Sequence, residues 1–435
     1  MNNSNGFKMT EIGQLPEDWD IMSIKDVAEI KYGKANPHTI GQVPLVGSSG
    51  IFGRVEKPLV DEPTLIIGRK GTAGSIHIFL IPSYPTDTTF YLLFDNNKPD
   101  LKFLFYWMSL NKLSGEHAKT TLPSLQKADL ENYQFCYPTL PEQHKIASVL
   151  STIQEAKGKT ENVLRATKEL KKSMMKHLFT YGPVPVKSPL SRGDLGVCQA
   201  EGKETHPLPL LLEGRQPKLK ETEIGMIPEH WGMVRLGEIS EFKNGINFSS
   251  NQKGVEGILT LDVLNMYTEN IYAKLNNLYR VRIDLKNKSD YLLKEGDVLF
   301  VRSSLKREGV GWASLFKSYK EPVTFCGFII RCRLKDASKI EHRFLISFLR
   351  SEAARKELLA GSEQVAITNI NQGLLNRLTL PFPPYNEQVQ IAETLRAIDE
   401  KIEAEQNKKQ ALDALFKTLL SLLMTGKIRV KDLDI

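Results

Sequence analysis

The chain contains the same framework twice. Residues 10–33 (TEIGQLPEDWDIMSIKDVAEIKYG) align without a gap with residues 222–245 (TEIGMIPEHWGMVRLGEISEFKNG), at an offset of 212. Residues 139–153 match residues 384–398 at an offset of 245, so the stretch between the paired segments is 33 residues longer in the second half. A duplicated frame that holds two unlike inserts predicts one scaffold that presents two different binding surfaces.

Composition sets broad limits on the class of protein. A length of 435 residues favours more than one domain, and 41% hydrophobic with 25% charged residues is ordinary for a soluble chain. The net charge of +7 is compatible with nucleic acid but equally with a basic protein that binds no polyanion. The four cysteines form no Cys-x-x-Cys pair, and no apolar run is long enough to span a membrane. We therefore expect a cytoplasmic protein without a metal site.

Two long helices are predicted, each after a globular half rich in short strands. The helices cover about 141–179 and 386–424, and in the second the apolar residues recur at alternating steps of three and four, the pattern of a coiled-coil seam. The first helix repeats this seam more weakly. Because neither helix can bury its stripe alone, antiparallel pairing with the other is favoured over two helices packed on separate domains. The residues assigned to helix pairing or partner docking are Ile146, Leu150, Ile153, Leu164, Ile391, Leu395, Ile398, Ile402, Leu412, Phe416 and Leu419.

The predicted fold class is α+β. Two mixed α/β domains are separated by two long antiparallel helices, which form an intramolecular coiled coil in a pseudo-two-fold repeat. Within the second domain, residues 297–302 are expected to form a buried strand and residues 342–359 one helix. The predicted segments are a first domain (1–138), a first helix (139–182), a linker or insertion (183–217), a second domain (218–382), a second helix (383–428) and a tail (429–435).

Motifs for catalysis are absent from the sequence. Residues 68–75 (GRKGTAGS) are rich in glycine but lack the Gly-Lys-Ser/Thr of a phosphate-binding loop, and no GxGxxG, HExxH or GxSxG motif is present. The segment Phe382-Pro383-Pro384-Tyr385 is similar to the tetrapeptide of amino-methyltransferases, but Phe382 cannot accept a hydrogen bond from a target amine. No catalytic residue and no metal ligand is predicted.

The order and duplication of these segments resemble the DNA-specificity subunit of a type I restriction–modification enzyme. The resemblance rests on the twin TEIGxxPxxW segments, the two unlike globular halves and the two long helices that begin with Glu-Gln. It implies that each half is a target-recognition domain for one half of a split DNA sequence. It also implies that the helices form a spacer and dock methyltransferase subunits, two being expected, with restriction or translocase subunits in addition. S-adenosylmethionine, ATP and Mg²⁺ would then be used by the partner subunits, and no cofactor by this chain. Residues 183–217, longer than a simple connector, depart from the pattern.

Two places in each half combine the residue types that DNA reading requires. The basic loop (68–72 and 302–307) follows a predicted strand, and the polar segment (119–127 and 364–372) precedes a long helix. Cationic side chains suit phosphates, and Asn or Gln can bind adenine with two hydrogen bonds. The alternatives are a solvated basic turn and ordinary loop capping. The candidate DNA-binding residues are Arg69, Lys70, Thr72, Lys119, Thr120, Ser124, Gln126, Arg302, Ser303, Ser304, Lys306, Arg307, Gln364, Thr368, Asn369, Asn371 and Gln372.

Two unlike readers on one rigid frame predict an asymmetric target made of two short sequences with an unread gap. Two rival functions remain open at this point. One is an enzyme with its own methyltransferase or nuclease activity, against which the missing motifs argue. The other is a scaffold whose twin domains bind proteins and have no affinity for DNA at any salt concentration.

Overall fold

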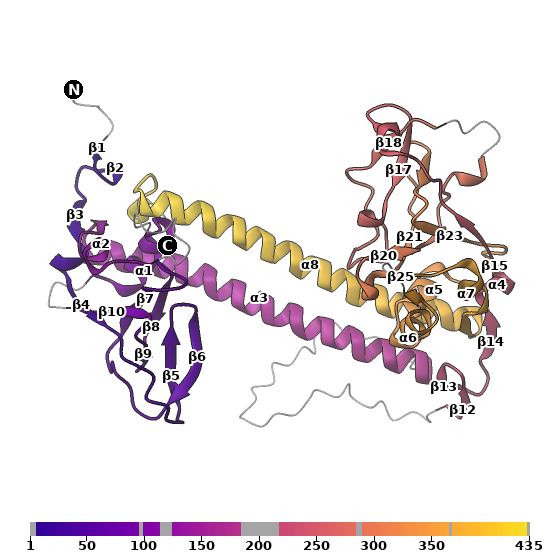
Figure 1. Ribbon diagram of the computed structural model, residues 1–435, viewed down its shortest axis with the longest axis horizontal. Helices are drawn as coiled ribbons and strands as arrows, with labels where there is room; N and C mark the ends of the chain where they lie inside the picture. Colours follow the sequence, from indigo (N-terminus) through magenta and orange to yellow (C-terminus); the bar gives the residue numbers. More distant parts are fainter. Residues whose placement is uncertain are drawn as a thin grey trace. The chain divides into compact units, whose positions relative to one another are not determined.

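The computed structural model describes residues 6–94, 99–113, 124–183, 217–283, 289–364 and 368–432. The chain divides into two compact units (Figure 1). Unit 1 comprises Met1–Val163 and Glu405–Ile435, and unit 2 comprises Leu164–Ala404. The two long helices, α3 (Leu140–Tyr181) and α8 (Tyr385–Met424), each contribute residues to both units. The prediction of two α/β parts with two long helices is confirmed.

The globular part of unit 1 combines short strands with two helices. The strands are β1 (Phe7–Thr10), β2 (Gly13–Pro16), β3 (Asp20–Ser23), β4 (Ala28–Tyr32), β5 (Val43–Gly47), β6 (Gly50–Val55), β7 (Thr64–Gly68), β8 (Ile76–Phe79), β9 (Tyr84–Pro85), β10 (Thr89–Phe94) and β11 (Gln134–Tyr137). The helices are α1 (Leu101–Leu110) and α2 (Lys127–Glu131). An antiparallel sheet of order β4-β10-β7-β8 lies beside a sheet of order β6-β5-β9, and β1-β2 and β3-β11 form two-stranded pairs.

Unit 2 repeats this topology with more strands. The strands are β12 (Leu219–Thr222), β13 (Gly225–Pro228), β14 (Gly232–Arg235), β15 (Ser240–Asn244), β16 (Lys253–Gly254), β17 (Ile258–Leu261), β18 (Tyr279–Val281), β19 (Val298–Val301), β20 (Ser303–Ser304), β21 (Ala313–Leu315), β22 (Val323–Phe325), β23 (Ile329–Leu334), β24 (Glu363–Gln364), β25 (Thr368–Asn369) and β26 (Thr379–Phe382). The helices are α4 (Leu236–Ile239), α5 (His342–Leu349), α6 (Glu352–Ala360) and α7 (Gln372–Arg377). One of its four-stranded sheets, β15-β23-β19-β21, matches β4-β10-β7-β8. In the other, β16-β18-β17-β22, the parallel pair β17-β22 matches β5-β9.

The two matching sheets, β4-β10-β7-β8 and β15-β23-β19-β21, each have one fully buried central strand. In β7 (TLIIG) and β19 (VLFV) every residue is buried, as expected for short runs of apolar and β-branched residues. The helix α1 packs Phe103, Leu104 and Trp107 into the same core as β7. These two strands matter for function because each leads directly into a basic loop.

The single helix predicted over residues 342–359 is wrong, because the structure has two. α5 ends at Leu349, and Ser351 takes an extended conformation with φ −67° and ψ 160°. Its hydroxyl accepts a hydrogen bond from the backbone of Ala354 at 3.4 Å and so caps α6. A serine that caps a new helix satisfies a backbone N–H that would otherwise lack a partner.

The duplicated tryptophans hold each globular part to the beginning of a long helix. Trp19 and Trp231 are buried, as predicted for core residues. In addition, the Trp19 indole donates to Glu142 at 3.1 Å, and the Trp231 indole donates to Glu387 at 2.8 Å. The residues that follow the other long helix of each unit pack on the same rings. After α8, a Cβ on Gly426 would lie 3.4 Å from Trp19, and after α3, one on Gly182 would lie 3.3 Å from Trp231.

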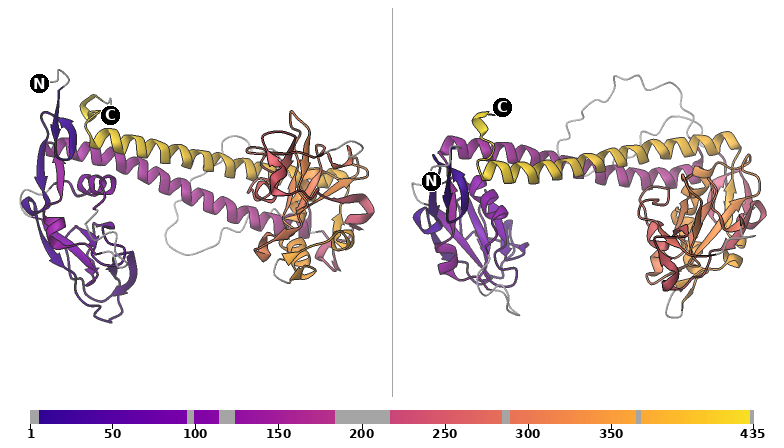
Figure 2. Two further views of the ribbon diagram at one scale, coloured as in Figure 1. Left: turned by 45° about the horizontal axis from the view of Figure 1, so that its top comes forward. Right: turned by 90° about the horizontal axis from the view of Figure 1, so that it is seen from above.

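Cross-helix ion pairs show that α3 and α8 are antiparallel. In unit 1, Lys157 pairs with Asp413 at 2.5 Å and Glu161 with Lys409 at 2.9 Å. In unit 2, Lys171 pairs with Asp399 at 2.6 Å. In each pair the two residue numbers add to 570, as antiparallel helices in constant register require. Both views of Figure 2 show the end of α8 beside the beginning of α3 in unit 1.

Both ends of the helix pair are also part of the globular cores. Ile146 and Leu150 lie in the core of unit 1, and Ile391 and Leu395 in the core of unit 2. Phe416 stacks edge-on against Tyr106 of α1, with ring centroids 5.9 Å apart. Of the other residues assigned to helix pairing, Ile153 and Ile402 are buried, whereas Leu164, Ile398, Leu412 and Leu419 are half-buried. The apolar stripe is therefore covered partly by the globular parts.

Candidate nucleic-acid interface

In unit 1 the structure brings the basic loop and the polar segment together. The loop follows β7, and Lys70 forms an isolated antiparallel bridge with Ser124. The backbone N–H of Leu125 donates to the Arg69 carbonyl at 2.8 Å. Two segments about fifty residues apart in the sequence thus form one surface, with Lys70, Thr72 and Gln126 exposed.

Unit 2 joins the equivalent segments by equivalent bonds. Ser303–Ser304 (β20) pairs with Thr368–Asn369 (β25) in an antiparallel ladder. The backbone N–H of Ile370 donates to the Arg302 carbonyl at 2.9 Å, the counterpart of the bond between Leu125 and Arg69. Each unit therefore presents an arginine from one segment and an amide side chain from the other on a common backbone frame.

In each unit, a carbonyl of a tight turn accepts a hydrogen bond from the backbone N–H of the arginine. The backbone N–H of Arg69 donates to Thr88 at 2.8 Å, and that of Arg302 donates to Phe328 at 2.7 Å. A glycine of the repeated segment packs directly on the backbone of this turn. A Cβ on Gly245 would lie 2.0 Å from the Cys326 carbonyl oxygen, and unit 1 has the same close approach at Gly33. Only glycine fits where two backbones approach this closely.

The two arginine side chains have different surroundings. The Arg69 guanidinium lies over the rings of Tyr32 and Phe90, 5.2 and 6.0 Å from their centroids. Its buried Nε has no hydrogen-bond partner among the described residues. Arg302 instead donates from Nη1 to the Gly327 carbonyl at 3.3 Å. Ring contact orients a guanidinium without neutralising its charge, which leaves it available to an anion or a guanine edge.

The remaining predicted residues differ in exposure. The side chains of Lys306, Arg307 and Asn371 are exposed. Arg69, Ser124, Arg302, Ser303, Ser304, Asn369 and Gln372 are half-buried, and Thr368 is buried. Lys119, Thr120 and the side chain of Gln364 lie outside the described residues.

Several of the predicted polar side chains already have structural roles. The side-chain oxygen Oδ1 of Asn371 caps α7 by accepting a hydrogen bond from the backbone N–H of Leu374 at 2.8 Å. Gln372 donates to Asn244 at 3.1 Å, and Ser303 donates to Asn369 at 2.5 Å. Asn371 is exposed, and its side-chain amide has donors as well as the oxygen that caps α7.

A third segment, which the sequence reasoning missed, contacts the basic loop in each unit. In unit 1 the β5–β6 turn provides Ser48, whose carbonyl accepts from the hydroxyl of Ser75. In unit 2 the matching connection runs from residue 262 to 278, and Tyr267 bonds Ser304 at 3.3 Å and Gly309 at 3.4 Å. The greater length of the second half was the available signal, because this connection contains part of the extra residues.

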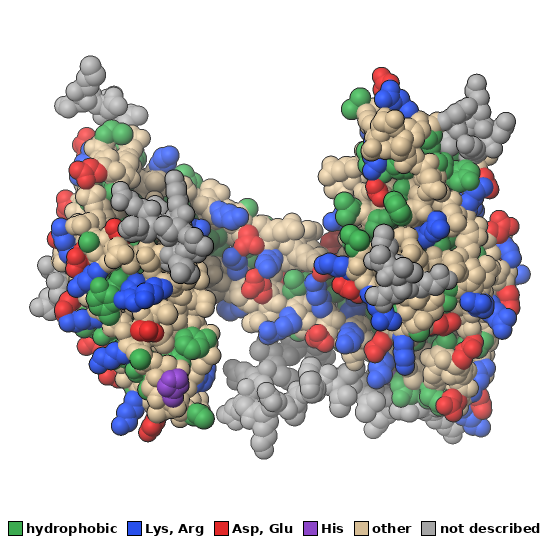
Figure 3. Space-filling model, in the orientation of Figure 1, with side chains coloured by type: hydrophobic (Ala, Val, Ile, Leu, Met, Phe, Trp, Pro, Cys, Tyr) green, Lys and Arg blue, Asp and Glu red, His purple; other side chains and the backbone are tan. Residues whose placement is uncertain are grey.

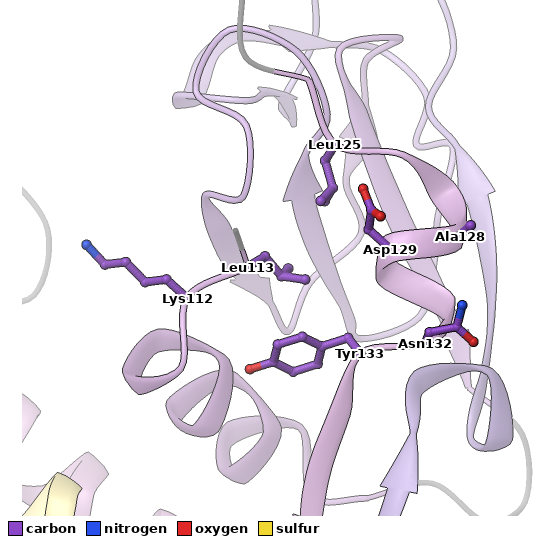
Figure 4. A pocket seen from close by; sticks show the side chains of 7 residues that line it. All are labelled: Lys112, Leu113, Leu125, Ala128, Asp129, Asn132 and Tyr133. Atoms are coloured by element: carbon purple, nitrogen blue, oxygen red, sulfur yellow. The ribbon is translucent and has the colours of Figure 1, made fainter. Parts of the chain in front are cut away.

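A cavity of about 470 Å³ opens beside the polar segment of unit 1 (Figure 4). Burial raises the pKa of Tyr133, and its hydroxyl donates to the Asn111 carbonyl at 2.5 Å. Asp129 accepts from the backbone of Gln126 at 3.1 Å, so neither group is placed as an activated nucleophile or base. The lining residues are Lys112, Leu113, Leu125, Ala128, Asp129, Asn132 and Tyr133.

Charge is mixed on the face of the molecule drawn in Figure 3. Figure 3 shows Lys and Arg side chains interspersed with Asp and Glu on the face that it draws.

Among the described residues no group of three or more His, Cys, Asp or Glu could hold a metal ion. In the same ranges no helix is long and apolar enough to cross a bilayer. The described cysteines, Cys136, Cys326 and Cys332, are buried free thiols, and burial raises the pKa of Cys326 to about 12.

Comparisons with known proteins agree with this repeated architecture. The family model of the type I restriction modification DNA specificity domain matches residues 16–170 and 228–414. The type I restriction enzyme MjaVIII specificity subunit of Methanocaldococcus jannaschii is 28% identical over 447 residues, covering 97% of this chain and 95% of the relative. The EcoDI specificity subunit of Escherichia coli is 20% identical over 96% of this chain and 90% of the relative.

A solved structure has the same fold along the chain. The S subunit of a type I restriction–modification system from M. genitalium aligns with a TM-score of 0.59 at 16% identity, over 97% of this chain and 98% of the other. The family model covers most of both halves. The chain belongs to the family of type I restriction–modification DNA specificity proteins.

Proposed function

We propose that this chain reads an asymmetric, split DNA sequence, with one half-site for each unit and an unread gap set by the helix pair. The observation that carries the proposal is the shared frame around Arg69 and Arg302. Both arginines have the same backbone partners in the fold, whereas the side chains on that frame differ between the units. A shared backbone arrangement that carries different side chains suits two different half-sites. Two identical domains would instead recognise a palindromic sequence.

Each interface residue has a distinct role in this proposal. The exposed cations Lys70, Lys306 and Arg307 neutralise phosphates and fix the register of the duplex. Arg69 and Arg302 read base edges, with guanine the favoured partner of a fork-shaped guanidinium. Gln126 and Asn371 occupy matching positions, each just before a short helix, and read adenine through their amides.

The chain acts as a non-catalytic subunit in this proposal. It directs methyltransferase subunits, two per chain, to the target, and restriction or translocase subunits join the same cytoplasmic assembly. S-adenosylmethionine, ATP and Mg²⁺ are then bound by those partners. Support comes from the family's domain, which matches both halves of the chain and so offers two equivalent docking places.

The test is base-resolution methylation sequencing of host DNA with and without the gene. Loss of one split motif, methylated on both strands, is the expected result, and it would give both half-sites and the gap. An unchanged methylation pattern, together with no salt-dependent binding of purified complex to DNA, would contradict the proposal and favour a protein-binding scaffold.

A further inference from the structure

Two large apolar side chains are exposed beside the reading arginine of unit 2. Leu305, in the basic loop, is 86% exposed, and Phe328, in the β22–β23 turn, is 58% exposed. Phe328 lies next to Arg302, whose N–H it accepts at 2.7 Å, and Leu305 follows Arg302 by three residues. An isolated exposed leucine needs no explanation, but two apolar residues that flank the same arginine in a candidate interface do.

Unit 1 has polar residues at the corresponding positions. Thr72 follows Arg69 by three residues, and the Thr88 carbonyl accepts the Arg69 N–H as the Phe328 carbonyl accepts that of Arg302. The Thr88 hydroxyl is engaged with Thr86 at 3.0 Å. The frame therefore does not require apolar side chains at these positions, and their presence is particular to the second reader.

The charge around the two residues indicates what covers them. Lys306 and Arg307 are exposed in the same loop as Leu305, and the backbone N–H of Arg302 in that loop donates to the Phe328 carbonyl. A surface on which cationic side chains lie next to apolar side chains is suited to a polyanion that also has apolar groups. In the major groove of DNA, the C5-methyl group of thymine is such a group, and apolar side chains contact it.

We propose that Leu305 and Phe328 read thymine methyl groups in the half-site of unit 2, while Lys306 and Arg307 hold the adjacent phosphates. This inference rests on the proposed function and adds a base class to it. Unit 2 discriminates thymine from cytosine partly by contact of these two large apolar side chains with the C5-methyl group. A thymine-dependent reader also gains from the exclusion of water around the methyl group.

The experiment replaces thymine by uracil, which removes the methyl group and keeps the base pairing. The probe is a duplex that carries the split motif found by methylation sequencing, with each thymine of either strand of both half-sites replaced in turn. Binding of the chain in complex with its modification subunits is measured at one fixed salt concentration. We expect at least one replacement to weaken binding by the wild type about four-fold, the equivalent of one methyl group returned to water.

Variants then connect the methyl group to the side chain. Leu305→Ser and Phe328→Ser remove the apolar side chain together with any methyl group that could contact thymine, and at exposed positions neither should unfold the protein, which thermal unfolding verifies. We expect one or both variants to bind the thymine duplex less tightly and to have lost the penalty for uracil. Val255→Ser, at a residue that is 90% exposed in unit 2, is the matched control and should keep the full penalty.

Three results would overturn the inference. The first is a wild type indifferent to uracil at every position. The second is a pair of variants that bind both the thymine and the uracil duplexes as tightly as the wild type does. The third is a loss of affinity in the variants that is equal for thymine and uracil duplexes, as expected of a wedge between base pairs. A failure of the proposed function is distinguishable, because no split motif would then be found.

Discussion

The indole of Trp19 donates a hydrogen bond to Glu142, and the indole of Trp231 donates the same bond to Glu387. The partners are separated by 123 residues in unit 1 and by 156 in unit 2, so the separations differ by the same 33 residues as the two repeat offsets. The extra residues of the second half therefore all lie between two fixed points of the frame. The frame is constant, and the reading surface is where the two units differ.

Removal of the Glu142 carboxylate should destabilise unit 1. Glu142 accepts from Trp19 and from Arg429, the latter at 2.7 and 2.9 Å. Glu142→Ala leaves a buried indole N–H without its acceptor, and we expect a loss of about 1–3 kcal/mol in the free energy of unfolding. Denaturant unfolding measures it, with Glu155→Ala, an exposed position in the same helix, as the control. Equal stability of the two variants would contradict the role assigned to the bond.

The same cluster gives a prediction about pH. Hydrogen bonds from Arg429 hold the pKa of Asp18 below its ordinary value, against the opposing effect of burial. A carboxyl group whose pKa is lower in the folded state stabilises that state above its unfolded pKa, and the contribution is lost as the pH falls through the folded pKa. The wild type should therefore be more stable than Asp18→Asn at neutral pH, and the difference should shrink only below about pH 4. Unfolding curves of both proteins between neutral and acidic pH check this, and a constant difference would oppose it.

Alanine at either repeated glycine should disrupt the turn that accepts the backbone N–H of Arg69 or Arg302. A Cβ at Gly33 or Gly245 would lie 2.0 Å from a carbonyl oxygen of the backbone, which cannot move aside as a side chain can. We expect each variant to lose about 3 kcal/mol or more of stability and to bind DNA weakly. Gly158→Ala is the opposite control, because it lies in α3 with no atom within 4 Å of the added Cβ, and it should stabilise the helix slightly.

Truncation of Arg302 should weaken binding of the target without unfolding unit 2. Arg302→Ala removes a charge from the basic loop, and we expect about a tenfold or greater loss of affinity and a salt dependence that is less steep by about one charge. Titrations at several salt concentrations give both quantities. Lys356→Ala, an exposed cation on α6 and outside the loops, should change neither. An unaltered affinity for Arg302→Ala would remove this residue from the interface.

Asn371 should affect both stability and base preference, and two variants separate these effects. Asn371→Ala removes the cap of α7 and should cost about 1 kcal/mol, in addition to relaxing one base of the second half-site. Asn371→Ser keeps a capping oxygen, so its stability should be close to that of the wild type while the base preference is still relaxed. Methylation sequencing with each variant reports the preference, and unfolding reports the cap. An unrelaxed motif with both variants would leave Asn371 a structural residue only.

The sequence predicts the frame better than the reading surface. The heptad pattern from Ile391 to Leu423 predicts a long helix and its partner, because apolar periodicity is a local signal. The meeting of Lys70 with Ser124 could not be predicted in the same way, since it depends on the strand order of the sheet. The contact of Tyr267 with the basic loop could not be predicted either, because a connection of irregular conformation has no periodic pattern of apolar residues. The break at Ser351 was missed because the apolar pattern continues across it, while a single hydroxyl ends one helix and begins the next.

The core of unit 1 has a consequence for the order in which the protein is completed during synthesis. Leu420, Leu423 and Val430 belong to that core, and Arg429 reaches back 411 residues to Asp18. Unit 2, which ends at Ala404, can be complete as a contiguous stretch while these last residues are still being added. The globular residues of unit 1 are therefore made before unit 2 but complete their core after it, which reverses the usual order in which successive domains mature.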